Sequence, residues 1–287
     1  MSRSAYEAAG VNLEAAAEAL DSITAAVQST YDDRVLAGLG AFGGLFELRN
    51  LPERPVLVAS TDGVGTKTMV AAQLDRVDGL GQDIVNHCLN DILVQGARPL
   101  FFLDYIASSR LSAQLITRVV ASAAAACREA GMPQLGGETA EMPGVYRSGE
   151  LDLVGTIIGI IGRDEIVDGS AIREGDVVVG LHSGGLQTNG FSLARSALDG
   201  RYGEPLDPDV PAGPTVGDAL LVPHRSYAGA VRPLLENSLL HGMAHVTGGG
   251  IAGNLVRVLP EGLSARIDTG TWQPPRIFDL IRKGGEV

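Results

Sequence analysis

The chain has 287 residues, 45% of them hydrophobic and 20% charged, which is typical of a globular protein long enough for two domains. Its formal net charge of -12 argues against a nucleic-acid surface, which needs a basic face, and an anionic ligand must be held by local groups. Two cysteines exclude a disulfide framework and favour a reducing cytosol, and the sequence shows no signal peptide or apolar stretch of membrane-spanning length.

The first half of the chain alternates helix and strand patterns. Residues 13–30 are alanine-rich with helical spacing, and Asn12 can cap that helix. A glycine-dense loop at 37–44 precedes an apolar run at 55–60, which predicts a strand. The further predicted elements are a helix at 80–95 ended by Gly96, a strand at 99–105, a helix at 112–130 ended by Gly131, and a core strand at 151–162.

The polar stretch at 163–176 interrupts this rhythm, and we place a domain boundary there, between residues 1–165 and 166–287. The second half predicts a strand at 177–181 and helices near 190–199 and 224–240. Strands and helices alternate in both halves, but the strands are not uniformly apolar. The sequence therefore predicts two α+β domains rather than one doubly wound sheet.

A glycine-rich loop at 60–68, reading STDGVGTKT, follows the first predicted strand. It contains Lys67, one of only two lysines among 22 Lys and Arg residues. Thr66 stands where a Walker A loop has glycine, so that pattern fails, and a capped strand-to-helix turn is the alternative interpretation. A carboxylate at Asp62, backbone amides and an ammonium group within one loop nevertheless favour phosphate with magnesium.

The predicted helix at 80–95 carries a stripe of short polar side chains on one face. Its members follow helical spacing: Asp83, Asn86, His87, Asn90 and Asp91. A solvated face would normally carry Lys, Arg and Glu, whereas short side chains suit the wall of a metal or ligand site. We therefore favour a functional role for Asn90 and Asp91, and we expect His87 to be packed or hydrogen-bonded.

Residues 135–144 combine glycines with two carboxylates three positions apart, Glu138 and Glu141. These carboxylates could complete a magnesium site with Asp62 and Asp91, or they could instead mark the start of a helix. Four candidates exceed the one or two protein carboxylates that magnesium on a polyphosphate typically uses, so some must have another role.

Two further glycine loops, at 183–190 and 245–250, each precede a predicted helical stretch. Their amides could bind an anion at a helix N-terminus, or the glycines could serve loop geometry alone. Three consecutive glycines at 248–250 are costly to order, which makes the second loop the stronger candidate.

Taken in order, these motifs resemble the phosphoribosylformylglycinamidine cyclo-ligase family, also called the aminoimidazole ribonucleotide (AIR) synthetase family, of purine biosynthesis. The resemblance runs from Tyr6 to the end of the chain. It is carried by Tyr6 with residues 9–11, Gly38-Leu39-Gly40, residues 61–67, Asn90-Asp91, residues 95–105, residues 136–144, Thr188-Asn189-Gly190, and His245 with residues 247–250.

The resemblance implies an AIR-synthase-like fold of two domains. The N-terminal domain would form a barrel with its twin across a homodimer, beside a C-terminal α/β sandwich-like domain. The implied reaction is the ATP-dependent ring closure of formylglycinamidine ribonucleotide to aminoimidazole ribonucleotide, with release of ADP and phosphate. The implied location is cytoplasmic, and the implied cofactors are ATP and Mg²⁺.

The resemblance also implies roles for individual residues. Catalysis would involve Asp62, Lys67, Asp91 and Glu138. Magnesium would be held by Asp62, Asn90, Asp91 and Glu138. ATP phosphate would be bound by Gly38, Gly40, Gly63, Val64, Gly65, Thr66 and Lys67. The substrate would be bound by Ser183, Asn189, Thr247, Gly248, Gly249 and Gly250.

The chain departs from the family pattern at three places. Thr24 and Gln187 stand where relatives often have lysine and histidine, and the chain ends at Val287, where relatives continue. The C-terminal domain is thus expected to lack the family's last segment. The alternatives are a non-catalytic ATP-binding homodimer, or a relative such as selenophosphate synthetase or thiamine-monophosphate kinase. The lack of any lysine before Lys67 counts against selenophosphate synthetase.

Overall fold

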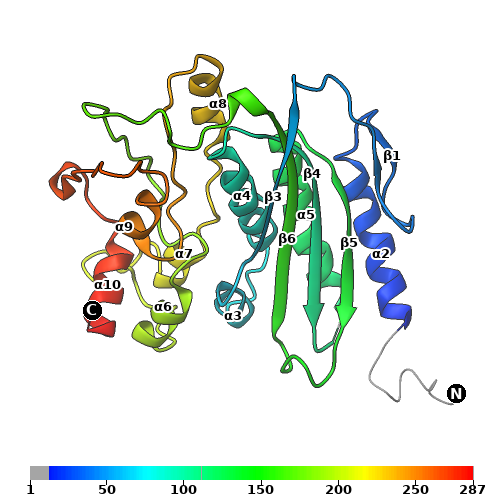
Figure 1. Cartoon of the computed structure of the whole chain (residues 1–287). Coiled ribbons are helices and arrows are strands. Elements are labelled where there is room, and N and C mark those ends of the chain that lie inside the picture. The colour runs from blue at the N-terminus through cyan, green and yellow to red at the C-terminus, as the bar shows by residue number, and fades with distance from the viewer. Residues whose placement is uncertain (1–12, 111, 287) are drawn as a thin grey trace, which may run out of the picture.

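The computed structural model describes residues 13–110 and 112–286. The predicted cap Asn12, Tyr6 and the motif at 9–11 lie outside the described residues. In Figure 1 a sheet with helices on one face is followed along the chain by a part rich in helices and loops. Among the helices described, none has both the length and the apolar character needed to cross a membrane.

A four-stranded sheet forms the centre of the first part. Its strands lie in the order β3 (Pro55–Gly63), β6 (Leu151–Gly162), β4 (Arg98–Ser108) and β5 (Gln134–Glu141). β6 is antiparallel to both β3 and β4, whereas β4 and β5 are parallel. β3 and β5 are therefore open edges, and the described part of one chain forms no closed barrel; the barrel across a homodimer stays a prediction.

Helices α4 (Leu80–Leu93) and α5 (Ala113–Ala130) cover one face of this sheet, and α2 (Leu13–Gln28) packs against α5 (Figure 1). The Ser112 hydroxyl caps α5 by accepting from the Leu115 N–H, and Gly131 ends it in the left-handed conformation. The predicted helices and strands of the first half are thus confirmed. Their core is built from fully buried side chains such as Ile84, Ile92, Phe102, Ile116 and Ile157.

Gly81 allows the close approach of α4 and α5. A Cβ atom at this position would lie 2.1 Å from the Val119 carbonyl oxygen and 2.3 Å from the Ala123 nitrogen. Because both atoms belong to the backbone of α5, they cannot rotate away. We expect Gly81→Ala to lower the free energy of unfolding by about 1–3 kcal/mol, measured by urea denaturation.

A matched control for Gly81 is Gly229→Ala in α8 (Ala228–Glu236), where an added Cβ would meet no heavy atom within 4 Å. That substitution should be neutral or should stabilise the fold by up to about 1 kcal/mol, because alanine favours helix. Equal effects of the two substitutions would contradict the close helix crossing.

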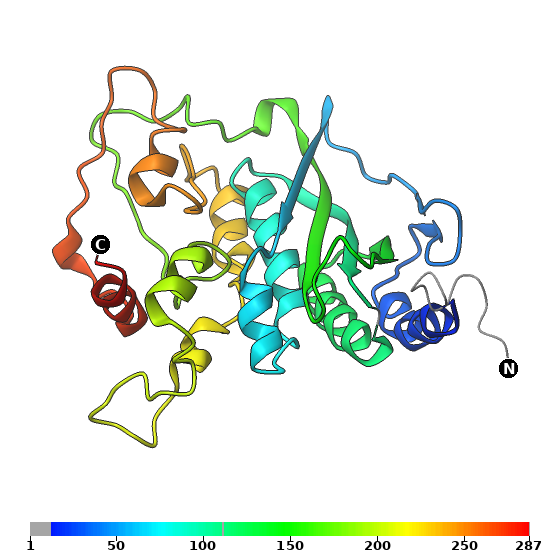
Figure 2. The ribbon, with the colours of Figure 1, turned by 90° about the horizontal axis from the view of Figure 1, so that it is seen from below.

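The remaining elements are short. A hairpin of β1 (Val35–Ala37) and β2 (Leu45–Phe46) encloses the glycine-dense loop beside α2. A 3-10 turn at Arg163–Glu165 follows β6. The second part contains α6 (Phe191–Leu198), α7 (Val216–Leu220), α8, α9 (Gly250–Leu255), a 3-10 turn at Thr269–Thr271 and α10 (Arg276–Gly285). Figure 2 shows the two parts side by side, with α4 between the sheet and the C-terminal helices.

The strand predicted at 177–181 is wrong. This segment is irregular, and its apolar side chains are exposed, with Val177 at 84% and Val179 at 76%. A β-branched run becomes a strand only when another strand supplies hydrogen-bond partners. Within 166–286 the structure has no strand beyond a single bridge between Pro205 and Thr215, so the expected α/β sandwich is replaced by helices and loops.

Candidate functional site

The polar stripe of α4 faces the C-terminal part of the chain and not solvent. Asn86 and Asn90 are each only 2% exposed. Asn86 Nδ2 donates to the His224 carbonyl oxygen at 2.8 Å, and Asn90 Nδ2 donates to the Arg225 carbonyl oxygen at 2.8 Å. Asn90 Oδ1 also accepts from the Tyr227 N–H at 3.1 Å. The polar stripe of α4 therefore forms an interface with the C-terminal part of the chain, and its amide groups bind the backbone of residues 224–227.

Lys67 turns its ammonium group inward, although it opens α3 (Lys67–Gln73) at the end of the glycine-rich loop. Its Nζ atom lies 2.8 Å from Asp83 Oδ1 and 2.8 Å from the Val222 carbonyl oxygen, and Lys67 is 1% exposed. Asp83 Oδ1 also accepts from the His224 N–H at 2.7 Å. The buried ion pair thus fastens residues 222–224 to α3 and α4.

Burial acts on both partners of this pair. It raises the pKa of Asp83 to about 6 and lowers the pKa of Lys67, while their mutual attraction opposes both shifts. The predicted contact between Lys67 and ATP phosphate would require the ammonium group to leave both partners. In this structure Lys67 instead links α4 to the C-terminal part of the chain, through Asp83 and the Val222 carbonyl oxygen.

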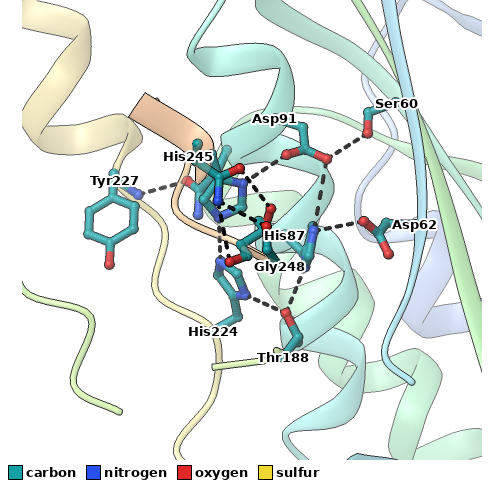
Figure 3. A network of polar contacts seen from close by, with 12 residues as sticks. Ser60, Asp62, His87, Asp91, Thr188, His224, Tyr227, His245 and Gly248 are labelled. Carbon is teal, nitrogen blue, oxygen red and sulfur yellow. Dashed lines mark hydrogen bonds and ion pairs between the residues drawn. The ribbon is translucent and has the colours of Figure 1, made fainter. Parts of the chain in front are cut away.

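Three of the chain's five histidines lie together beside this interface between α4 and the C-terminal part of the chain (Figure 3). His87 comes from α4, and His224 and His245 come from C-terminal loops. The ring centroids lie 5.0 Å apart for His87 and His224, 5.1 Å for His87 and His245, and 5.2 Å for His224 and His245. Segments far apart in the sequence thus build one imidazole cluster.

Two carboxylates flank the imidazole cluster. Asp62, from β3, places Oδ2 2.9 Å from His87 Nε2, and Asp91, from α4, places Oδ1 2.8 Å from His245 Nδ1 (Figure 3). A hydrogen bond with His87 holds the pKa of Asp62 below its usual range. Burial raises the pKa of Asp91, but hydrogen bonds from His245 and Ser60 outweigh it and leave that pKa lowered. Both carboxylates are therefore ionised at neutral pH.

Some backbone amides of the glycine-rich loop that were predicted to bind phosphate form hydrogen bonds within the protein. The Gly63 N–H donates to Asp62 Oδ1 at 2.6 Å, and the Val64 N–H donates to the Leu153 carbonyl oxygen at 2.9 Å. Gly65 has φ +67°, which lets the chain turn from β3 into α3. Two of the four predicted amide donors are therefore already engaged.

Two family models match the chain. The model described as AIR synthase related protein, N-terminal domain, matches residues 36–161, and the model of the corresponding C-terminal domain matches residues 173–286. The chain belongs to the AIR synthase related family. The fold is thus a two-domain AIR-synthase-like fold, and the predicted boundary after residue 165, which stays a prediction, falls between the two matches.

Named relatives of this AIR synthase family member share nearly its whole length. A phosphoribosylformylglycinamidine cyclo-ligase from Desulfitobacterium hafniense is 47% identical over 284 residues, covering 98% of this chain and 83% of that protein. One from Anaeromyxobacter dehalogenans is 49% identical over 285 residues, covering 98% and 82%. The solved thiamine-monophosphate kinase from Stenotrophomonas maltophilia K279a, 20% identical, has TM-score 0.55 and covers 84% of this chain and 70% of that one, which indicates a shared fold.

In this AIR synthase fold the predicted site residues do not all meet. Asp62 pairs with Gly155, Gly155 with Asp104, and Asp104 with Gly137, which precedes the exposed Glu138. Three strand spacings of about 4.8 Å therefore separate Glu138 from Asp62, roughly 14 Å. Within one chain the structure does not bring Glu138 to Asp62, and both amide atoms of Asn90 are bonded elsewhere.

The nucleotide and substrate residues predicted on loops are likewise dispersed. Gly38 and Gly40 lie in the β1–β2 hairpin beside α2, at the other edge of the sheet from β3 (Figure 1). The 247–250 loop is separated from His245 by Val246 alone, and it is partly to fully exposed. In the 183–190 loop, the Ser183 hydroxyl donates to the Gly185 carbonyl oxygen, and Asn189 is half-buried.

His224 is the residue that sequence reasoning missed, and His87 was expected only to be packed or hydrogen-bonded. A lone histidine in a loop gives no signal of its own. The only hint was that a chain with five histidines carries two of them, His87 and His245, within motifs already selected for chemistry. The arrangement as a whole offers ionised carboxylates, imidazole rings and an exposed glycine loop.

His224 makes stability depend on pH. Burial lowers the pKa of His224 from 6.5 to about 2, with the neighbouring His87 and His245 contributing. Because the folded-state pKa lies below the unfolded value, its contribution is fully present above pH 6.5 and is lost as the pH falls below it. We expect urea denaturation to show a loss of up to about 1.4 kcal/mol per pH unit from this group. His224→Gln should flatten that slope, and an unchanged slope would contradict the burial of a neutral imidazole.

Proposed function

We propose that the chain catalyses the ATP-dependent ring closure of formylglycinamidine ribonucleotide to aminoimidazole ribonucleotide, releasing ADP and phosphate in purine biosynthesis. The observation that carries this proposal is the high identity, over 98% of the chain, to relatives named as phosphoribosylformylglycinamidine cyclo-ligases. Asp62 and Asp91, which both belong to motifs of that family, meet at one imidazole cluster. A non-catalytic ATP-binding dimer is not favoured by these relatives.

The proposed reaction needs positioning and charge neutralisation more than covalent help. The formyl amide oxygen takes the γ-phosphoryl group of ATP, which gives ADP. The amidine nitrogen then attacks the activated carbon, phosphate departs with that oxygen, and the nitrogen loses a proton. The loop Thr247–Gly250 is the proposed holder of the substrate's 5-phosphate, and Ser183 and Asn189 remain further proposed substrate contacts.

Asp91 has a defined part in this proposal. Its Oδ1 atom orients the His245 ring, which precedes the 247–250 loop by one residue. An ionised carboxylate at this position keeps the adjacent Nδ1 atom protonated and the ring fixed. The ring is then held in one orientation beside the proposed phosphate loop.

Magnesium fits part of the predicted ligand set. The side chains of Asp62 and Asp91 are 45% and 27% exposed, both are ionised, and carboxylate oxygens are the donors that Mg²⁺ prefers. Bound there, the ion would neutralise charge on the phosphates of ATP. Asn90 and Glu138 remain predicted ligands, but their geometry in this chain supports Asp62 and Asp91 better. The Gly65 and Thr66 amides and the glycines at 38 and 40 remain the proposed phosphate contacts.

We further propose a homodimer and a cytoplasmic location. The open edge β3 supports the dimer, because Leu57 on this strand is 63% exposed and an open edge offers unpaired backbone groups. Light scattering coupled to gel filtration tests it, since a monomer mass would contradict the dimer.

The proposed activity is tested by coupled measurement of ADP and phosphate release. Release is expected only when ATP, magnesium and formylglycinamidine ribonucleotide are all present. Calorimetry with ATP on the same sample separates the alternatives: ATP binding without turnover would support the non-catalytic dimer. Phosphate release without the ribonucleotide would instead indicate another ATP-using enzyme.

A further inference from the structure

Gln187 adopts a backbone conformation that is unusual for a buried residue with a side chain. Its φ of +58° lies in the left-handed region, which glycine adopts freely and other residues adopt uncommonly. The structure describes seven non-glycine residues with positive φ, and Gln187 is the only buried one, with 7% of its surface exposed. Because glycine would fit here without strain, the reason for a glutamine must lie in the contacts of its side chain.

The hydrogen bonds around Gln187 fix the orientation of its side-chain amide. The Tyr227 hydroxyl lies 3.1 Å from the His182 carbonyl oxygen, which can only accept, so Tyr227 donates its single proton there. Towards Gln187, at 2.9 Å, the same hydroxyl must therefore accept. The Ser183 carbonyl oxygen, 3.3 Å away, also accepts. The group that faces both oxygens is thus the amide nitrogen, and both of its hydrogens are used.

The amide oxygen of Gln187 is left as an acceptor. Within the described chain, both hydrogen bonds of this side chain involve Nε2, and Oε1 receives no donor. The fully buried side-chain oxygens without a partner in that part of the chain are Asp83 Oδ2 and Gln134 Oε1, so Gln187 Oε1 keeps some contact with solvent. An oxygen held in this way offers a fixed lone pair to a donor on a bound ligand.

Gln187 belongs to the loop that carries two of the proposed substrate contacts. The hydroxyl of Thr188, the next residue, lies 2.6 Å from His87 Nδ1, so this loop reaches the imidazole cluster (Figure 3). On the other side of Gln187, the Tyr227 N–H donates to Asn90 Oδ1 at 3.1 Å. Because His87 and Asn90 both lie on α4, the position of Gln187 is fixed from α4 through two neighbours.

We propose that Gln187 is a specificity-determining residue, whose Oε1 atom accepts a hydrogen bond from the amidine N–H of the substrate. This inference rests on the proposed function, because formylglycinamidine ribonucleotide is the compound that carries the amidine. An oxygen acceptor favours an N–H donor and disfavours a carbonyl oxygen in the same place. Gln187 would thus separate the amidine from the corresponding carboxamide, which has an oxygen in place of the unsubstituted nitrogen.

The test compares the affinity of the full chain for formylglycinamidine ribonucleotide and for its carboxamide analogue. Calorimetry with ADP in place of ATP excludes turnover from the readout. The wild-type chain is expected to bind the amidine about 100-fold more tightly than the carboxamide. Gln187→Met keeps the length of the side chain but removes the acceptor, and it should reduce this ratio by about 10- to 100-fold. A purely structural role would instead lower both affinities together and leave their ratio unchanged.

Two controls accompany the measurement. Gln114→Met changes a glutamine that is exposed on α5 and should leave the ratio unchanged. Gln187→Gly and Ser238→Gly form a matched pair, because both residues have positive φ and Ser238 is exposed. Glycine relieves the strain at each position, so both variants should fold, which circular dichroism checks, and only Gln187→Gly should lower the ratio.

The outcomes separate this inference from the proposed function. Equal wild-type affinity for the two compounds, or an unchanged ratio in both Gln187 variants, would overturn the role of Gln187. Turnover of the amidine with ATP would in that case leave the proposed function standing. A wild-type chain that neither binds nor converts the amidine would overturn both.

Discussion

Replacing Lys67 with methionine is expected to lower the free energy of unfolding by about 3–5 kcal/mol, because the substitution leaves Asp83 as an uncompensated buried charge. Lys67 is 1% exposed and Asp83 is fully buried, with Asp83 Oδ2 already lacking a hydrogen-bond partner. The substitution also removes the donor to the Val222 carbonyl oxygen. Urea denaturation at pH 7.5 measures the loss.

Two controls separate the ion pair from general effects of removing a lysine. Lys283→Met changes the only other lysine, which is exposed on α10, and should alter stability by no more than about 0.5 kcal/mol. The double variant Lys67→Met with Asp83→Leu should recover much of the loss, since no charge is then left unpaired. A stable Lys67→Met chain with weakened ATP binding would instead support the predicted phosphate contact.

The Lys67 result would also explain how the two domains are held together. The pair fixes residues 222–224 on α3 and α4, and the same segment carries His224 into the imidazole cluster. An exposed lysine at this position could not order that backbone. The isolated lysine in a glycine-rich loop was therefore a correct signal of importance, but the sequence did not reveal which group the ammonium meets.

Local patterns predicted the N-terminal helices and strands well, because the caps and the apolar spacing of each segment indicate the same element that the structure forms. Ser112 and Gly131 bound α5, and the apolar residues of 151–162 alternate along a buried strand. The interpretation of residues 135–144 as a loop or a helix start was wrong, although three glycines and two carboxylates are typical of such segments. Residues 135–141 instead belong to β5, where Gly137 is required because a Cβ atom would lie 2.2 Å from Asp104 Oδ1.

The candidate site could be predicted only in part, because its residues come from segments that lie far apart in the sequence. Helical spacing placed Asn90 and Asp91 on one face, and the structure keeps them there. Spacing could not show that this face is buried against the C-terminal part of the chain. It also could not show that both amide atoms of Asn90 form hydrogen bonds with the backbone of residues 225 and 227, or that His224 lies beside His87. Carboxylates on different strands, such as Asp62 and Glu138, cannot be placed without the strand order.

Asp91→Asn is expected to reduce the turnover number by about 10²–10⁴-fold while the fold is kept. Asparagine has the shape of aspartate, and its oxygen can still accept from His245 Nδ1, so the His245 ring stays in place. What is lost is the negative charge that neighbours His87 and, in the proposal, balances a cation.

The measurement is the rate of phosphate release with saturating ATP and formylglycinamidine ribonucleotide, beside the urea midpoint of the same variant. Asp176→Asn is the control, because Asp176 pairs with His241 on the surface and lies in neither proposed site. It should leave the rate within about twofold, since surface changes away from a site rarely matter. If Asp91→Asn also retained its rate, Asp91 would serve only to hold His245. Asparagine keeps the shape of aspartate but not its charge. A lower rate of phosphate release by Asp91→Asn, at an unchanged free energy of unfolding, would therefore assign the effect to the charge.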